Sequence, residues 1–210
     1  MERGCGRIST TRTIHSRMVE IHTANQRSAP CRPDTGGVKL LPVTLPDAVM
    51  LSEFGANAGF NLLLDRCSLN AGRTLQPADD PIVTLSPDWM GVIPAQQPLK
   101  IIDRAGVDIN PLNPVDRLDY SRLLSYTWAD QCVRLDHIKQ IAPHQTIMVE
   151  QTDAVDWLPN RLSKQRIGTL HFVFHTIALQ YFPQESKDKI AHALAQAGKR
   201  ATPERPLGYI

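Results

Sequence analysis

The sequence predicts an α/β fold with a mostly parallel sheet. From residue 47 onward, short apolar and β-branched runs alternate with segments whose apolar residues recur at helical spacing. This alternation is typical of a parallel sheet covered by helices on both faces. The chain has 210 residues, of which 42% are hydrophobic and 21% are charged, so it can bury a sizeable core. We therefore expect one α/β domain over residues 47–210.

The first strand and helix open this domain. The apolar run AVML predicts a strand at 48–53, and the leucine-rich FNLLLDR predicts a helix at 60–66. A stretch rich in Pro, Asp and Gly follows at about 68–98, and we expect an inserted flap over one end of the sheet. The second strand is predicted in RAGVDINP, at 105–109, and it ends against Pro111.

The later elements follow the same alternation. TIMVEQ (146–151) and GTLHFVFH (168–175) are rich in β-branched, aromatic and other apolar residues and predict the third and fourth strands. Apolar residues at helical spacing predict helices at 116–126, 130–141, 152–158 and 184–198. We predict that the four strands lie in the order 3-2-1-4, with helices on both faces of the sheet.

Residues 1–46 have a different composition. Arginines are spread among Ser, Thr, Gly and Pro, with few acids and little apolar periodicity, so we expect a disordered or loosely packed segment. An organellar transit peptide is an alternative interpretation of this composition. A nucleic-acid-binding arm is not expected, because no aromatic residues are interleaved and no lysines cluster.

Charge and cysteine content exclude several classes of protein. The net charge of +2 gives no reason to expect a polyanionic partner. No apolar run approaches the roughly 18 to 20 residues of a membrane span, and no secretory signal is evident, so we expect a cytoplasmic protein without a membrane partner. The four cysteines contain no C-x-x-C pair, so neither a metal site nor a redox motif is predicted.

Polar residues mark the ends of the predicted strands, where open α/β sheets bind ligands. The first strand ends in a loop of small residues, EFGANAG, and the second and third end near an acid. Small residues allow a ligand to approach the backbone, and carboxylates accept hydrogen bonds from ribose hydroxyls or an adenine amino group. The candidate cofactor-binding residues are Glu53, Gly55, Asn57, Gly59, Asp108, Asp153 and Ala154.

Each of these positions also has a structural interpretation. The loop at 53–59 could be a tight corner between a strand and a helix, Asp108 could form an Asx turn, and Asp153 could cap a helix. The glycine spacing is E-x-G-x-x-x-G, whereas a dinucleotide-binding loop has G-x-G-x-x-G and faces a pyrophosphate. The loop therefore favours a cofactor with a zwitterionic tail.

His175, at the end of the fourth strand, is the candidate catalytic base. His171 lies four residues earlier on the same face, but no third ligand is positioned to complete a metal site, and a core histidine is the simpler interpretation. Gln180 and Tyr181 could line the same pocket, although Tyr181 could also pack. No metal is predicted.

Several motifs together carry a resemblance. E-x-G-x-x-x-G, GVDINP, TDAVDWL and HFVFHTIALQYFP look like a class I S-adenosylmethionine-dependent methyltransferase fold. SEFGANAGFNLLLDR, AGVDINPLNPVD, YTWADQ, DAVDWLP and VFHTIALQYFP resemble a bacterial family, domain of unknown function 2332, in order from about Leu45 to Gln196. The resemblance implies a Rossmann-like scaffold and S-adenosylmethionine as cofactor.

The resemblance also draws attention to YTWADQ. Because the family carries a similar segment, Trp128, Asp130 and Gln131 are candidate residues of a substrate-pocket lid. The alternative is that Asp130 caps a helix and Trp128 lies in the core.

The chain departs from the methyltransferase pattern after the fourth strand. Such a fold would continue with three more strands, so the C-terminal strands are expected to be missing and the strand at 168–175 to be an exposed apolar edge. An edge of this kind favours self-association, or a truncated and marginally stable protein.

We therefore predict S-adenosylmethionine binding, with methyl transfer to an unknown small-molecule acceptor. The alternative is a non-catalytic or truncated remnant of the scaffold that serves as an interaction protein. The absence of an acceptor-site motif such as N-P-P-Y favours this alternative.

Overall fold

The computed structural model describes residue 46 and residues 48–70, 74–76, 78–87 and 100–210. The segment expected to be disordered, 1–46, therefore lies almost entirely outside the described residues. The same holds for the last part of the flap expected at 68–98.

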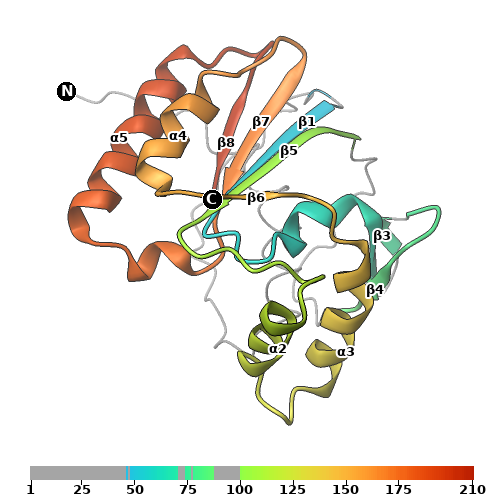
Figure 1. Cartoon of the computed structure of the whole chain (residues 1–210). Helices are drawn as coiled ribbons and strands as arrows, with labels where there is room; N and C mark the ends of the chain where they lie inside the picture. The colour runs from blue at the N-terminus through green and yellow to red at the C-terminus, as the bar shows by residue number, and fades with distance from the viewer. Residues whose placement is uncertain (1–45, 47, 71–73, 77, 88–99) are drawn as a thin grey trace, which may run out of the picture.

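The centre of the protein is a five-stranded sheet in which every neighbouring pair is parallel (Figure 1). Across the sheet the strands are β6 (Val149–Gln151), β5 (Lys100–Asp108), β1 (Ala48–Phe54), β7 (Thr169–Phe174) and β8 (Leu207–Tyr209). The predicted α/β fold with a mostly parallel sheet is confirmed. β1 lies in the middle and is buried along nearly its whole length.

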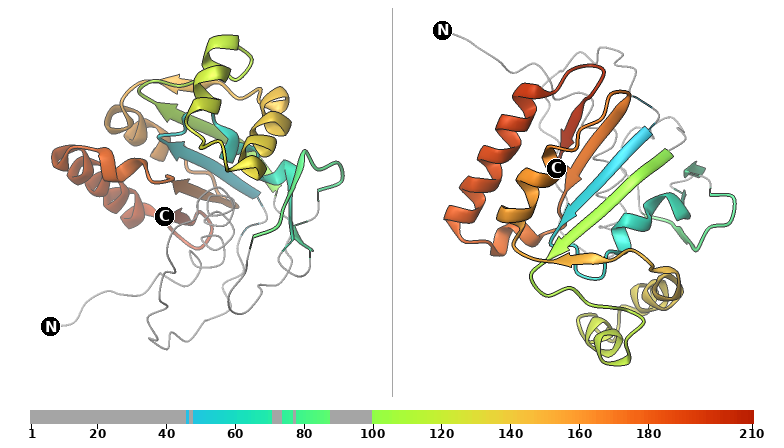
Figure 2. Two further views of the ribbon diagram at one scale, coloured as in Figure 1. Left: turned by 90° about the horizontal axis from the view of Figure 1, so that it is seen from below. Right: turned by 45° about the horizontal axis from the view of Figure 1, so that its top comes forward.

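One face of the sheet is covered by two helices, α4 (Ala154–Leu162) and α5 (Gln184–Arg200). Phe54, Val107 and Val173 point from the sheet into a core that these helices complete with Trp157, Leu158, Ile190 and Leu194. Successive side chains of a strand point to opposite faces, so the neighbours of these sheet residues face the other side. In Figure 2 (right), α4 and α5 lie together on one side of the strands.

The opposite face carries the 3₁₀ helix η1 (Phe60–Arg66). Leu62 and Leu64 of η1 pack there with Val49, Leu51 and Leu170. Beyond η1 is a small sheet in the order β3-β2-β4, formed by Thr74–Gln76, Cys67–Asn70 and Val83–Leu85. The described part of the segment expected to be a flap therefore contains two strands of a second sheet, with β2 beginning just before it.

Three further elements complete this side of the molecule. α2 (Arg117–Ser125) and α3 (Cys132–Ile141) pack together through Leu123 and Ile138, and the 3₁₀ helix η2 (Ala142–His144) follows α3. Figure 1 shows α2 and α3 toward the end of the sheet to which the arrowheads of β1 and β5 point.

The expected exposed edge at the fourth strand is wrong. β8 pairs in parallel with β7, placing His171, Phe172 and Val173 opposite Leu207, Gly208 and Tyr209. Phe172 and Val173 are fully buried. LGY is too short to show strand alternation in sequence, so this strand was not predicted.

β5 is also longer than predicted, because it begins at Lys100. Its first half contains Asp103 and Arg104, which made the stretch resemble a loop. In the fold both charges are paired, Asp103 with Arg161 and Arg104 with Asp65. Within the described ranges, no helix is both long and apolar enough to cross a bilayer.

Candidate functional site

The strand order defines one place where loops diverge. The chain passes from β1 to β5 and β6 on one side, then crosses to β7 and β8 on the other. Right-handed crossovers put the two sets of connections on opposite faces of the sheet, so the strand order reverses between the carboxyl ends of β1 and β7. Ligands of open α/β sheets bind at such a point.

Glu53 lies at this reversal point and is fully buried. Its Oε1 accepts a hydrogen bond of 2.7 Å from the Asn61 side-chain amide and lies 3.5 Å from the Thr176 hydroxyl. Its Oε2 is buried and has no hydrogen-bond partner among the described residues. Burial raises the pKa of Glu53 to about 8, and the nearby Asp108 adds a smaller upward shift.

Asp108 ties the loop after β5 to the loop after β1. Its Oδ2 accepts from the Asn57 backbone N–H at 2.8 Å, and its Oδ1 accepts from the Asn110 N–H at 2.9 Å. The second bond forms an Asx turn, which is the structural interpretation of Asp108 that the sequence allows. Each oxygen has a protein donor, and each retains a lone pair that could accept from a ligand hydroxyl.

The small residues after β1 are packed against protein. A Cβ at Gly55 would overlap the Cβ of Ala178, and one at Gly59 would overlap the Gln145 side chain, whose amide donates to the Ala58 carbonyl. Gly55 and Gly59 have φ of 68° and 69°, so glycine serves both the turn and the close packing. The corner interpretation is therefore correct for these two glycines.

Two residues beside Glu53 adopt left-handed backbone conformations. Asn57 has φ 50°, and Ile177, in the loop after β7, has φ 64°. Such a conformation is unfavourable for a β-branched residue, and strained residues of this kind cluster at functional sites. Both lie in the loops that follow β1 and β7, where the strand order reverses.

His175 is not brought together with Glu53. Its ring lies 5.0 Å from that of Phe54 and 6.1 Å from that of Tyr209, on the face covered by α4 and α5. Glu53, the residue before Phe54, points to the other face. The candidate base and the buried carboxyl are therefore on opposite sides of the sheet.

Asp153 caps a helix, as its structural interpretation predicted. Its carboxylate accepts from the Val155 backbone N–H at 2.8 Å, and Ala154, which begins α4, is buried in the core below. The Asp153 side chain is exposed and free to reach a ligand with its second oxygen.

The candidate substrate-pocket residues lie on the surface. Trp128 is 79% exposed, so its placement in the core is wrong, and Tyr181 is 79% exposed. Asp130 and Gln180 are also exposed, while Gln131 precedes α3 without a side-chain cap bond. None of these five residues lines the groove between α4 and α5 that is described below.

A second polar cluster, not predicted from sequence, lies in the middle of the sheet. Arg161 of α4 donates from Nε to the Ser52 hydroxyl at 2.8 Å and from Nη1 to Asp103 at 2.8 Å. Because Ser52 Oγ accepts from Arg161, its own hydrogen is available for Nε2 of His171, 2.8 Å away. This network joins α4 to the sheet; Ser52, His171 and Arg161 are buried in it, and Asp103 is partly exposed.

His171 is thus a core histidine. Burial and the neighbouring Arg161 lower its pKa to about 4, so the ring is neutral. Among the residues that the structure describes, no three His, Cys, Asp or Glu side chains gather into a metal site.

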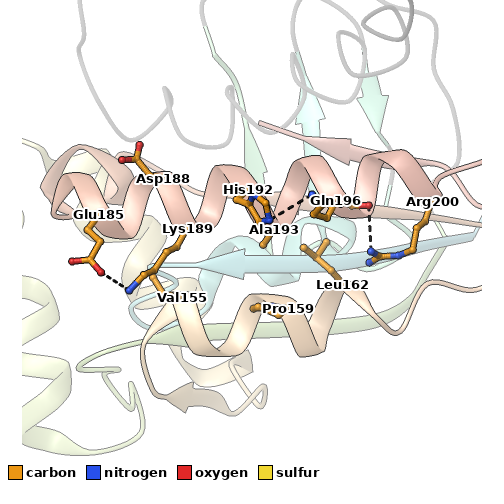
Figure 3. A pocket seen from close by; sticks show the side chains of 10 residues that line it. All are labelled: Val155, Pro159, Leu162, Glu185, Asp188, Lys189, His192, Ala193, Gln196 and Arg200. Atoms are coloured by element: carbon orange, nitrogen blue, oxygen red, sulfur yellow. Dashed lines mark hydrogen bonds and ion pairs between the residues drawn. The ribbon is translucent and has the colours of Figure 1, made fainter.

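A groove runs along the outer side of the helical layer (Figure 3). Val155, Pro159 and Leu162 of α4 face Ala193 of α5 across it, and a Glu185–Lys189 ion pair of 2.6 Å lies near one end. None of the sequence-predicted site residues lines this groove. We place the candidate site at Glu53, because among the described residues that carboxyl is the one that is buried with an oxygen left unpaired.

The fold and these residues define an α/β protein with a parallel five-stranded sheet and a polar cluster at the carboxyl ends of its central strands. The chain belongs to the family described as "Uncharacterized protein conserved in bacteria (DUF2332)", whose model matches residues 27–210. Neither the curated proteins nor the solved structures contain a match to the chain.

Proposed function

We propose that this protein binds S-adenosylmethionine between the carboxyl ends of β1 and β7, on a Rossmann-like, methyltransferase-like scaffold. The single observation that carries the proposal is Glu53: a fully buried carboxyl, with one unpaired oxygen, at the point where the strand order reverses. A buried polar atom without a partner is costly, and such groups concentrate where a ligand supplies the partner.

Asp108 and Asp153 support a nucleoside-bearing ligand. Asp108 ends β5, which pairs with β1, and Asp153 follows β6, which pairs with β5. Each carboxylate keeps acceptor capacity beyond its bonds to the backbone. In this arrangement Asp108 would accept from ribose hydroxyls, and Asp153 from the adenine amino group.

Methyl transfer to a small acceptor is the reaction proposed for the bound cofactor. The sulfonium is already activated, so the protein's contribution is to align donor and acceptor. The position of His175 between Phe54 and Tyr209 gives it no direct path to Glu53, so the proposal does not route a proton through His175.

Isothermal titration calorimetry of the folded protein with S-adenosylmethionine tests the proposal. We expect saturable 1:1 binding that weakens at least tenfold in Asp108→Ala. Asp153→Ser provides a sharper comparison, because serine keeps the helix cap while it removes the carboxylate. Unchanged affinity in Asp153→Ser would remove the adenine role from Asp153, and no binding by the folded wild type would overturn the proposal.

The second candidate is a non-catalytic interaction protein. It is favoured by apolar side chains exposed around α2 and α3, among them Leu118 at 76%, Trp128 at 79% and Val133 at 66%. The packing of Gly55 and Gly59 against protein also fits a scaffold without cofactor. Folded protein that ignores S-adenosylmethionine would favour this candidate.

A further inference from the structure

We propose that Glu53 binds the ammonium group of the ligand's amino-acid tail, and that binding expels the carboxyl proton into solvent. The inference rests on the proposed function and assigns one part of the ligand to one atom, Oε2. It makes occupancy of the site dependent on pH.

The first support is geometric. The hydrogen bonds that described side chains donate to the Glu53 carboxyl are both to Oε1, from the Asn61 amide of η1 at 2.7 Å and from the Thr176 hydroxyl in the loop after β7 at 3.5 Å. Oε2 is left buried and without a described partner. The carboxyl is therefore held in place by one oxygen while the other is available.

The second support is the charge around the carboxyl. Of the groups that face it, Asn61 and Thr176 are neutral and Asp108, from β5, is acidic. Within the described part of the chain, no Lys, Arg or His forms an ion pair with Glu53. Arg104 of β5 and Arg161 of α4, two cationic side chains that contact the sheet, are paired with Asp65 and Asp103.

These surroundings disfavour an ionised carboxyl and hold the proton on Glu53 near neutral pH, as the pKa of about 8 indicates. A cation placed at Oε2 reverses that preference, because an opposite charge within a few ångströms stabilises the carboxylate. The balance is simple: the neutral acid and the ligand ammonium become a carboxylate–ammonium pair, and one proton passes to the buffer.

The same surroundings exclude other ligand groups. A phosphate or carboxylate placed at Oε2 would bring a further negative charge to a place that already holds two acidic side chains, Glu53 and Asp108, and no described cation pairs with Glu53 to offset it. Among the parts of S-adenosylmethionine, the α-ammonium is the hydrogen-bond donor with positive charge, whereas the sulfonium has no N–H or O–H to donate. We therefore assign Oε2 to the ammonium.

Calorimetry at pH 7 in two buffers of different ionisation enthalpy, phosphate and Tris, measures the proton released. The probes are S-adenosylmethionine, S-adenosylhomocysteine and 5′-methylthioadenosine; the third lacks the amino-acid tail. We expect the first two to release close to one proton and the third to release none. Affinity for the first two should rise up to about tenfold per pH unit between pH 6 and pH 8, since binding and deprotonation are linked.

Two variants complete the test. Glu53→Gln should bind S-adenosylmethionine more weakly and without proton release, and Asp80→Asn, which removes an exposed carboxylate away from the main sheet, should behave as the wild type. Binding without proton release would overturn this inference and leave the proposed function standing. Equal release by 5′-methylthioadenosine would also overturn it, and no binding of any probe would overturn both proposals.

Discussion

At the scale of single residues, Glu53 is the feature that most needs an explanation. Its carboxyl is fully buried with one oxygen unpaired, and burial raises its pKa to about 8. A carboxyl with a pKa raised by folding is protonated in the folded state and ionised in the unfolded state between pH 4.5 and pH 8. Unfolding therefore releases a proton in this range, and stability falls as the pH rises.

Glu53→Gln should consequently be more stable than the wild type at high pH. The amide keeps the shape of the side chain and cannot ionise, so the difference in the free energy of unfolding should grow from near zero at pH 4.5 to roughly 4 kcal/mol at pH 8. Urea unfolding of both proteins across this range measures it. Asp80→Asn is the control, and a constant difference between Glu53→Gln and wild type would contradict the assignment of the raised pKa.

His171 titrates in the opposite sense. Its folded-state pKa of about 4 lies below the ordinary value of 6.5, so the unfolded chain takes up a proton first as the pH falls. The stability that neutral His171 contributes is complete above pH 6.5 and is lost as the pH drops toward 4.

We expect this loss to amount to roughly 3 kcal/mol in the wild type and to be absent in His171→Gln. The measurement is the slope of unfolding free energy against pH between 4 and 6.5. His192→Gln, on the exposed side of α5, should keep the wild-type slope. Identical slopes in wild type and His171→Gln would show that this buried network does not carry the acid sensitivity.

At the scale of elements, the corner after β1 shows how a cofactor-like pattern can serve packing. Gly55 has a left-handed backbone and lies against Ala178 of η3 (Ala178–Tyr181), which follows β7. The glycine therefore allows the loops after β1 and β7 to pack closely together beside Glu53.

Gly55→Ala should therefore destabilise the protein more than Gly168→Ala. Both glycines have positive φ, but nothing lies within 4 Å of the place where a Cβ at Gly168 would be. We expect about 1 to 2 kcal/mol for Gly168→Ala, from backbone strain alone, and at least about 1 kcal/mol more for Gly55→Ala, from the added overlap.

Chemical denaturation of the two variants measures this difference. The double variant Gly55→Ala/Ala178→Gly removes the overlap and should recover most of the excess. Equal costs for the two single variants, or no recovery in the double variant, would show that Ala178 does not determine the choice of glycine at position 55.

Local sequence patterns predicted most of the large elements. β1, β7 and α5 have apolar patterns strong enough to be recognised without tertiary context. β8 could not be recognised, because its three residues form a strand only when β7 is beside them. The exposure of Trp128 could not be predicted either, since nothing in YTWADQ shows which way the turn between α2 and α3 faces.

The candidate site was predictable only in part. Glu53 and Asp108 could be predicted, because both lie at strand ends and the carboxyl ends of parallel strands meet at one edge of the sheet. Asn61 and Thr176, which hold the carboxyl, were missed, because Thr176 lies 123 residues from Glu53 in the chain and meets it only across the sheet. His175 was assigned to the same site because sequence alone does not show which face a residue takes after a strand ends.

At the scale of the whole molecule, two sets of connections of opposite direction meet at β1. The first set begins with η1, which packs on one face, and the other set, through α4 and α5, covers the opposite face (Figure 2). The reversal of strand order at Glu53 is therefore a consequence of topology, and the network of Arg161, Ser52 and Asp103 fixes α4 against the sheet beneath it.

The groove between α4 and α5 is the competing candidate for a ligand site, since Val155, Pro159, Leu162 and Ala193 give it apolar walls (Figure 3). Glu53 does not line it. The two sites make different predictions about which residues respond when ligand is added. If the ligand binds at the strand ends, residues in the loops after β1 and β7 should respond. If it binds in the groove, residues on the facing sides of α4 and α5 should respond.

The most direct measurement is the amide chemical-shift map of the ¹⁵N-labelled full chain during titration with S-adenosylmethionine. We predict saturable shifts centred on Asn57, Asn61 and Thr176, which are reduced in Glu53→Gln while its spectrum shows an intact fold. Shifts centred on Val155, Lys189 and Ala193, or no shifts at millimolar ligand, would contradict the assignment of a cofactor site to the carboxyl ends of β1 and β7.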